Sequence, residues 1–290
     1  MFFEVFKIVF PLIVIALAGF LYTKYQKTSM QTTDKINIDF FIPIMIFYYL
    51  SEKLPSISEI GTFALGGVMV VFGSAIVIYP FIKIFKLNAN TFLPPMMFNN
   101  SINLGLPLAL FAFGQEAMSL AISLSIVQVI GQFTIGATLY GGKFEIQALL
   151  KNPVIVATIF GLSFNYLDVH LPALLLVAFK MLAQVSIPLV LFSLGAKLTS
   201  IEIKYWKIGL LGAILCPLSG IIMALLAIYI FDYTALQTSL IILFGALPPA
   251  VLNAIMAQKY DNDSIMVASV VAFGTLFAII FIPIVLYFIM

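Results

Sequence analysis

The chain has 290 residues, of which 63% are hydrophobic and 9% are charged, and its mean hydropathy is +1.16. Because soluble proteins carry about 25% charged residues, this composition predicts an integral membrane protein, and the length allows about ten membrane-spanning helices with no separate soluble domain. The formal net charge of +2 is too small to suggest a nucleic-acid partner, and all 14 basic residues are lysines, so no arginine is present to clamp a carboxylate or phosphate.

The first half of the chain, residues 1–142, contains five apolar segments. The first of them is followed by Lys24 and Lys27 and has no small-residue cleavage site, so we expect a retained helix and not a signal peptide. In chain order, the predicted segments are 8–22, 40–50, 63–82, 91–113 and 117–140.

The fourth of these segments is interrupted. Its central stretch, LPPMMFNNSINLGLP at residues 93–107, contains three prolines, one glycine and three asparagines. Proline removes a backbone donor and clashes with the preceding turn, so the stretch cannot form one continuous helix. Lipid offers no water to satisfy the freed backbone groups, and a broken helix is tolerated there only where it is buried in protein or lines a cavity. The break therefore predicts a binding site.

A short polar linker, residues 143–152, is predicted to connect the first half to a second half, residues 153–290, on the cytoplasmic side. In the second half, the stretch LPPAVLNA repeats the earlier LPP and places Asn253 where the first stretch has Asn99. Two interrupted segments at matching places in two halves are the best sequence pointer to a transporter's binding site. The predicted segments of the second half are 154–167, 181–194, 208–231, 240–257 and 265–289.

Two further blocks match between the halves. PLIVIALAG at residues 11–19 resembles PVIVATIFG at residues 153–161, and IPIMIF at residues 42–47 resembles IPLVLF at residues 187–192. Because each half has an odd number of segments, the second would be inserted upside down relative to the first. The sequence therefore predicts an all-α membrane protein of about ten transmembrane helices, built as an inverted five-plus-five repeat with two broken helices that cross.

The lysines predict the orientation in the membrane. If the N-terminus faces outward, eleven of the 14 lysines fall on the cytoplasmic side, and Lys7, Lys53 and Lys180 are the other three. We therefore expect a multi-pass protein of the plasma (inner) membrane with both termini outside the cytoplasm. The eleven are Lys24, Lys27, Lys35, Lys83, Lys86, Lys143, Lys151, Lys197, Lys204, Lys207 and Lys259.

The predicted crossing is suited to an anion. A broken helix exposes unpaired N–H groups and about half a positive charge where its second part begins, so two such ends could hold an anion without a charged side chain. Residues 91–115 and 240–258 contain no charged residue, although asparagine and serine side chains also often serve only to join membrane helices. The predicted substrate-binding residues are Asn99, Asn100, Asn103 and Asn253; the predicted crossover backbone is Pro94, Pro95, Gly105, Pro107, Pro248 and Pro249; and the predicted secondary polar contacts are Ser101, Gln128, Gln132 and Gln184.

Several blocks resemble the auxin efflux carrier family, which includes plant PIN carriers and bacterial transporters of malate or malonate type. They are NNSINLGLPLALFAFGQEA, NPVIVATIFG followed by LPALLL, IPLVLFSLGAKL, LPPAVLNAIMAQKY and GTLFAIIFIPIVLYF, and together they cover nearly the whole chain. The resemblance implies a fold akin to bile-acid symporters and sodium/proton antiporters, in which a transport subdomain moves against a scaffold subdomain. It also implies that crossing prolines and nearby asparagines help to bind an organic carboxylate. The matching positions are Asn99, Asn100, Pro107, Pro248, Pro249 and Asn253.

The leading functional hypothesis is a secondary transporter that moves a small organic anion, a carboxylate of malate, malonate or auxin type, by alternating access. A sodium-coupled symporter of bile-acid type and a membrane sensor without transport activity are the alternatives. Coupling to sodium or protons stays open, no cofactor or metal is expected, and the resemblance suggests a homodimer. The sequence has no His-Glu-x-x-His motif and no phosphate-binding P-loop, so it predicts neither an enzyme nor an ATP-driven pump.

Overall fold

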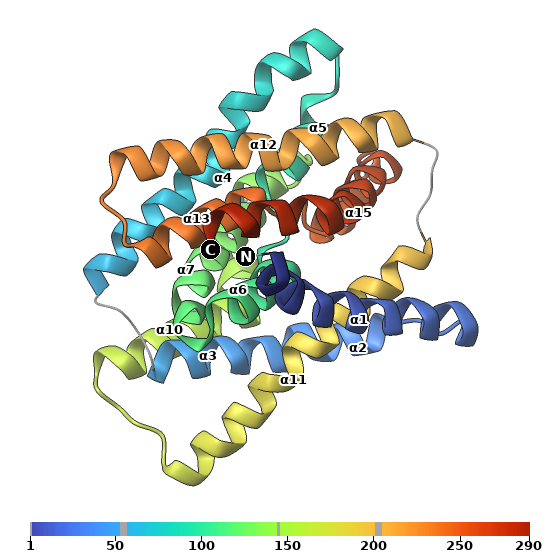
Figure 1. Cartoon of the computed structure of the whole chain (residues 1–290). Coiled ribbons are helices and arrows are strands. Elements are labelled where there is room, and N and C mark those ends of the chain that lie inside the picture. The colour runs from blue at the N-terminus through green and yellow to red at the C-terminus, as the bar shows by residue number, and fades with distance from the viewer. Residues whose placement is uncertain (1, 53–56, 144–145, 201–204) are drawn as a thin grey trace.

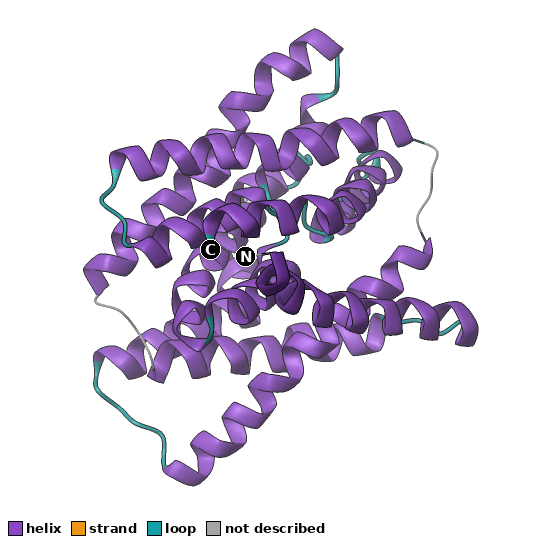
Figure 2. Cartoon of the chain, viewed as in Figure 1, coloured by secondary structure: helices purple, strands orange, loops and turns teal. Residues whose placement is uncertain are grey.

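The computed structural model describes residues 2–52, 57–143, 146–200 and 205–290, and every element named in these ranges is helical (Figure 2). The predicted all-α class is therefore confirmed. Part of the predicted linker, residues 144–145, and the lysines Lys53 and Lys204 lie outside the described residues.

Each apolar segment predicted before residue 143 falls on one helix or on consecutive helical pieces. The second segment begins in a π-helical turn, η1, and the fourth is divided into three pieces, α5, η2 and α6. The elements are α1 (Phe2–Gln26), α2 (Gln31–Ile36), η1 (Asn37–Phe41), α3 (Ile42–Glu52), α4 (Ile57–Phe85), α5 (Ala89–Met97), η2 (Ser101–Gly105), α6 (Leu106–Phe113), η3 (Gln115–Ala117), α7 (Met118–Gly131), η4 (Gln132–Gly136) and α8 (Ala137–Leu139).

The later elements follow the predicted segments equally closely, and the ninth is divided into α13 and α14. They are α9 (Ile146–Leu150), α10 (Pro153–Tyr166), α11 (Ala173–Lys197), η5 (Leu198–Ser200), α12 (Trp206–Ile230), α13 (Ala235–Ala246), α14 (Leu252–Lys259) and α15 (Ser264–Ile289).

Membrane-spanning potential is strongest in a subset of these elements. In the described ranges, 6 helical stretches are long and apolar enough to cross a membrane. The other predicted segments form shorter apolar helices, so the number of crossings and the repeat stay predictions. The six stretches are Phe2–Gln26, Ile60–Phe85, Gln115–Leu139, Ala173–Lys197, Trp206–Ile230 and Ser264–Ile289.

Helices α1, α3, α10 and α11 pack together in the lower part of Figure 1. Glycine makes the contact between α1 and α11 unusually close. A Cβ atom on Gly195 would lie 1.7 Å from the carbonyl oxygen of Ala16, and one on Gly19 would lie 1.9 Å from the carbonyl oxygen of Phe192. Because no larger residue fits there, the two backbones touch directly.

Helices α4, α5, α12, α13 and α15 form the upper part of the same view, where α12 packs against α4, α13 and α15. The contact between α12 and α13 again uses glycine, because a Cβ atom on Gly220 would lie 2.1 Å from the carbonyl oxygen of Gly245. This contact fixes the last turns of α13, just before its chain leaves the helix.

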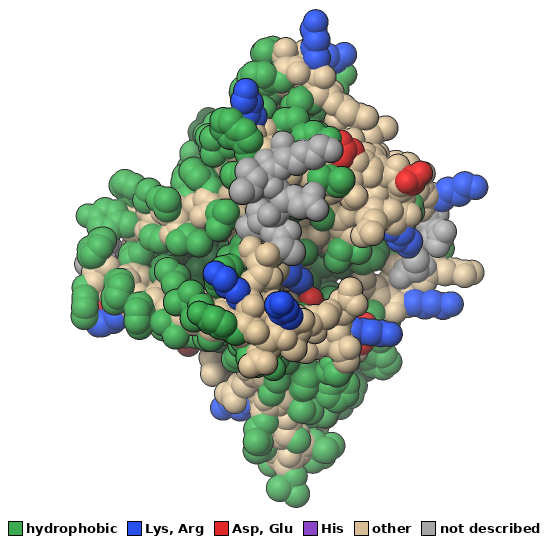
Figure 3. Space-filling model, turned by 90° about the vertical axis from the view of Figure 1, so that its right-hand side faces the viewer, with side chains coloured by type: hydrophobic (Ala, Val, Ile, Leu, Met, Phe, Trp, Pro, Cys, Tyr) green, Lys and Arg blue, Asp and Glu red, His purple; other side chains and the backbone are tan. Residues whose placement is uncertain are grey.

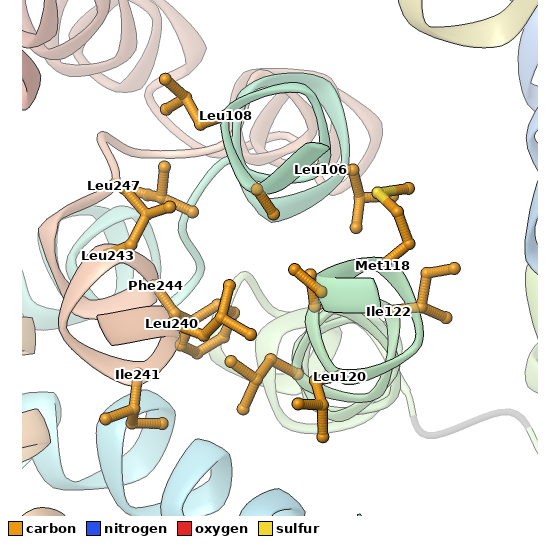
Figure 4. Close-up of a cluster of buried hydrophobic side chains, with 14 of the residues drawn as sticks. Leu106, Leu108, Met118, Leu120, Ile122, Leu240, Ile241, Leu243, Phe244 and Leu247 are labelled. Atoms are coloured by element: carbon orange, nitrogen blue, oxygen red, sulfur yellow. The ribbon is translucent and has the colours of Figure 1, made fainter. Parts of the chain in front are cut away.

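A core of apolar side chains joins α6, α7 and α13 (Figure 4). Leu106, Met118, Leu240 and Phe244 are each at most 4% exposed. Because lipid is as apolar as these side chains, close van der Waals packing between the helices is what stabilises this core. The core therefore holds α6 and α7, which follow the interruption after α5, beside α13, which precedes the interruption before α14.

Candidate functional site

The two broken segments cross and bond to each other through their backbones. The first is non-helical between α5 and η2, and the second between α13 and α14. The amide of Asn100 donates to the carbonyl of Pro248 at 2.7 Å, and the amide of Ala250 donates to the carbonyl of Phe98 at 2.9 Å. These bonds form an antiparallel bridge that pairs Asn99 with Pro249. Because the bonds come from the flanking residues, the missing N–H of Pro249 leaves no gap in the bridge.

Asn99 and Asn253 brace this crossing reciprocally. The Asn99 side chain donates from Nδ2 to the carbonyl of Phe244 at 2.6 Å, and the Asn253 side chain donates from Nδ2 to the carbonyl of Phe98 at 2.8 Å. Each asparagine thus satisfies a carbonyl of the opposite broken segment. The structure brings together the two asparagines that the sequence pairs, and gives both a bracing role.

A chain of buried side chains extends from Asn253 into the helices behind it. Its Oδ1 accepts hydrogen bonds from Gln132 Nε2 at 3.3 Å and from the Tyr140 hydroxyl at 3.4 Å. Gln128 Nε2 donates to Gln132 Oε1 at 2.9 Å, and the Ser101 hydroxyl donates to Gln128 Oε1. The structure therefore brings Ser101, Gln128 and Gln132 together beside the crossing, and their contact with a substrate stays a prediction. Tyr140 was not predicted, although its spacing of eight residues from Gln132 places it on the same helical face.

Two side-chain amide atoms of the first break make no hydrogen bond to any described residue. Among the described residues, Asn99 Oδ1 and Asn100 Nδ2 have no hydrogen-bond partner, although the two residues are only 5% and 2% exposed. Leaving such a buried group unpaired costs about 1 to 3 kcal/mol. By contrast, both side-chain atoms of Asn253 are bonded. The open hydrogen-bonding capacity at the crossing thus belongs to the first broken segment.

The prolines are distributed differently from the prediction. Pro94 and Pro95 lie inside α5 rather than in a break, and Pro107 lies in the first turn of α6. Helix α5 continues past its prolines because the amide of Phe98 bonds to the carbonyl of Pro94 at 2.9 Å and closes the last turn. Of the predicted crossover backbone, Pro248 and Pro249 lie in a break, whereas Gly105 ends η2. The interaction between the breaks, and not the nearest proline, therefore sets where the first helix ends.

Asn103 lies just after the first break, whereas Gln184 lies away from both breaks. Asn103 is part of η2 and lines a small cavity of about 30 Å³. Gln184 is an exposed residue of α11, one position from the buried face that includes Ala183, so the structure does not bring it to the crossing. The apolar sequence around Gln184 does not reveal which face of α11 is buried.

A wider cavity, the vestibule, opens beside the small cavity and has a volume of about 460 Å³. It lies between α2 and α11 on one side and α14 and α15 on the other, and Asp34 and Lys197 line both cavities. Lys197 Nζ lies 2.8 Å from Asp34 Oδ2, and the Ser193 hydroxyl donates to Asp34 Oδ1. Figure 3 shows lysine side chains around a hollow on the face of the molecule where these elements end. Sequence reasoning missed this ion pair because its members are far apart in the chain.

Comparison with known proteins places these features in a family. Residues 141–286 match the model of a family described as membrane transport protein, so the chain belongs to this family, the auxin efflux carriers. An uncharacterized transporter of Methanocaldococcus jannaschii is 24% identical over 201 residues, which cover 63% of this chain and 63% of the relative. The chain thus matches less than two thirds of that relative's length. These similarities confirm the predicted family, and together with the apolar helices they indicate a multi-pass membrane protein.

Proposed function

We propose that the protein is a secondary transporter that moves a small organic anion by alternating access around the crossing of the two broken helices. The observation that carries this proposal is a pair of buried side-chain amide atoms, Asn99 Oδ1 and Asn100 Nδ2, which have no partner among the described residues and lie at an uncharged crossing. Because Asn100 Nδ2 is a donor, it suits an anionic oxygen, whereas Asn99 Oδ1 suits a hydroxyl or a protonated carboxyl group. Among carboxylates of malate, malonate or auxin type, malate can pair with both atoms through its carboxylate and hydroxyl and auxin through its carboxylate and N–H, whereas malonate does so when one of its carboxyl groups is protonated.

Helix ends supply the positive potential for this anion. The helical piece that starts at Ser101 and the helix α14 that starts at Leu252 both begin directly after a break. Each start carries about half a positive charge and amide groups without intrahelical partners. An anion would therefore be held mainly by dipoles and amide donors, and no buried lysine would be needed.

Two groups of helices support a rocking or sliding motion. Helices α1, α3, α10 and α11 would form the scaffold subdomain, and the remaining long helices with the crossing would form the transport subdomain. Figure 1 shows the two groups one above the other. All four helices of the scaffold group contact the other group, for example α1 with α15 and α11 with η2, but less extensively than α1 contacts α11 or α3 contacts α10. Such an arrangement lets one group move while the packing inside each group is kept.

The glycine contacts support the proposed inverted repeat. Gly19 lies against Phe192, and Gly161 lies against Phe47, with its Cβ position 3.3 Å from that carbonyl oxygen. Gly19 and Gly161 occupy the same place in the two matching PxIVxxxxG blocks, and Phe47 and Phe192 end the two matching IPxxxF blocks. The first half of the chain therefore contacts the second as the second contacts the first, which is the relation expected of repeats at residues 1–142 and 153–290.

The orientation and the coupling belong to the same proposal. The vestibule opens toward the lysine-rich face, which the positive-inside rule assigns to the cytoplasm, so the described conformation would be inward-facing with both termini outside. We propose the plasma (inner) membrane as the location and a homodimer as the assembly. Sodium or protons are the candidate coupling ions.

Uptake of labelled malonate, succinate and benzoate into proteoliposomes tests the proposal. The assay is run with and without sodium, with a pH step and with an imposed membrane potential, for the wild type and for Asn100→Ala. Asn90→Ala is the matched control, since Asn90 is an exposed asparagine of α5. We expect flux in the wild type and the control and at least tenfold less in Asn100→Ala, because a hydrogen bond to a charged group contributes about 1.5 to 3 kcal/mol. A folded wild type that moves none of the three anions would refute the proposal.

A further inference from the structure

The Asp34–Lys197 pair stands between the vestibule and the small cavity. Both residues line both spaces, and they are the charged residues among those that line them. The side chain of Lys197 is 36% exposed and that of Asp34 is 22% exposed, so solvent in the vestibule reaches the pair. An anion that entered the vestibule would meet this lysine before it reached the crossing.

The small cavity behind the pair touches both helix starts of the crossing. Asn103 comes from η2, which follows the first break, and Val251 directly precedes α14, which follows the second break. Both residues lie in or beside the first turn of a helical piece, which is the positive end of its dipole. The cavity therefore lies where the helix dipoles favour negative charge.

A buried polar group without a partner also lines this cavity. Asn37 is 3% exposed, and its Oδ1 has no hydrogen-bond partner among the described residues. Its Nδ2 is held by the carbonyl of Ser186 at 3.2 Å, which fixes the amide so that Oδ1 remains the open acceptor. Such an acceptor fits a hydroxyl group of a substrate or a water molecule that hydrates an anion. The cavity is thus incomplete without a polar occupant.

We propose that Lys197 is a second anion-binding residue, which captures the substrate's carboxylate in the vestibule by releasing Asp34 and then passes it toward the crossing. The inference rests on the proposed function and adds an entry site to it. Lysine suits this exchange because its ammonium is a compact charge with three donors on a flexible stem. Asp34 retains the hydroxyl of Ser193 as a partner when the lysine turns to the anion. The two carboxylates, that of Asp34 and that of the substrate, would therefore compete for one cation.

This competition predicts opposite effects for the two members of the pair. Lys197→Gln removes the cation and should raise the KM for malonate uptake about tenfold with little change in kcat. Asp34→Asn removes the competing carboxylate and should lower the KM, whereas Lys197→Arg should keep it near the wild-type value. Lys259→Gln is the matched control, because it makes the same charge change at the end of α14 and lines neither cavity.

The experiment uses the full chain in proteoliposomes with malonate, succinate and benzoate, and measures KM and kcat on the vestibule side together with the thermal unfolding of each variant. A purely structural ion pair would make Lys197→Gln and Asp34→Asn unfold at lower temperature and lose kcat together, with KM moving in the same direction. That result would overturn the inference, and so would a Lys197→Gln variant with the same KM as Lys259→Gln. In either case, flux in the wild type would leave the proposed function intact. Absence of any wild-type flux would overturn both.

Discussion

The break between α5 and η2 and the break between α13 and α14 contribute different groups to one crossing. The second break contains Pro248 and Pro249, which set its extended shape, and the asparagine that follows it, Asn253, uses both of its side-chain atoms in hydrogen bonds. The first break contains no proline, and its residues Asn99 and Asn100 each keep one amide atom that bonds to none of the described residues. This difference is the basis for our proposal that the second break sets the shape of the crossing and the first binds the ligand.

The largest effect is expected when the brace of the second break is removed. Asn253→Ala deletes the donor to Phe98 and the acceptor for Gln132 and Tyr140, all at buried positions. We expect a loss of about 3 kcal/mol in the free energy of unfolding, because buried groups are left unpaired on both sides. Thermal unfolding in detergent micelles measures this loss. Surface substitutions usually change the free energy of unfolding by no more than about 0.5 kcal/mol. If Asn253→Ala stays within that range of the wild type, the second break does not depend on this residue.

A smaller and split effect is expected at the first break. Asn99→Ala removes the hydrogen bond to the carbonyl of Phe244 and should lower the free energy of unfolding by about 1 to 2 kcal/mol. Asn100→Ala removes no side-chain hydrogen bond that the described residues make, so the loss should be less than about 1 kcal/mol. Flux should nevertheless fall in both. Unfolding and transport are measured on the same preparations, and an Asn100→Ala variant that is as unstable as Asn253→Ala would contradict the assignment of ligand binding to the first break.

The chain of side chains behind Asn253 gives the third test. Gln132→Leu removes the donor to Asn253 Oδ1 and the acceptor for Gln128, while Tyr140 still bonds to Asn253. Because one partner of Asn253 remains, we expect a loss of about 1 kcal/mol, which lies between the effects at Asn253 and at Asn100. Gln184→Leu on α11, which changes an exposed glutamine in the same way, is the control for unfolding.

The sequence predicted which segments are helical and which two of them are interrupted, because long apolar runs act locally and prolines seldom occur in an uninterrupted helix. It did not predict where the first interruption lies, since Pro94 and Pro95 are inside α5 and the break follows them. It did not predict the register of the crossing. The repeated LPP aligns Pro94 with Pro248, but the structure pairs Asn99 with Pro249, since hydrogen bonds between distant segments decide which residues are extended. The ion pair of Asp34 and Lys197 was not predicted for the same reason, since its members are distant in the sequence. Asn253 was predicted because it stands in the repeated block.

The smallest change in stability is expected at the prolines, where Pro94 of α5 is compared with Pro248 of the second break. Pro248→Ala should lower the free energy of unfolding by about 0.4 to 1 kcal/mol, because proline at a compatible extended position restricts the unfolded chain. Pro94→Ala should cause no loss, because it restores an amide donor inside α5, where proline is unfavourable. Thermal unfolding of the two variants, measured side by side, checks this difference in sign. Equal losses would mean that Pro94 also shapes the crossing, and the assignment of shape to the second break alone would then be wrong.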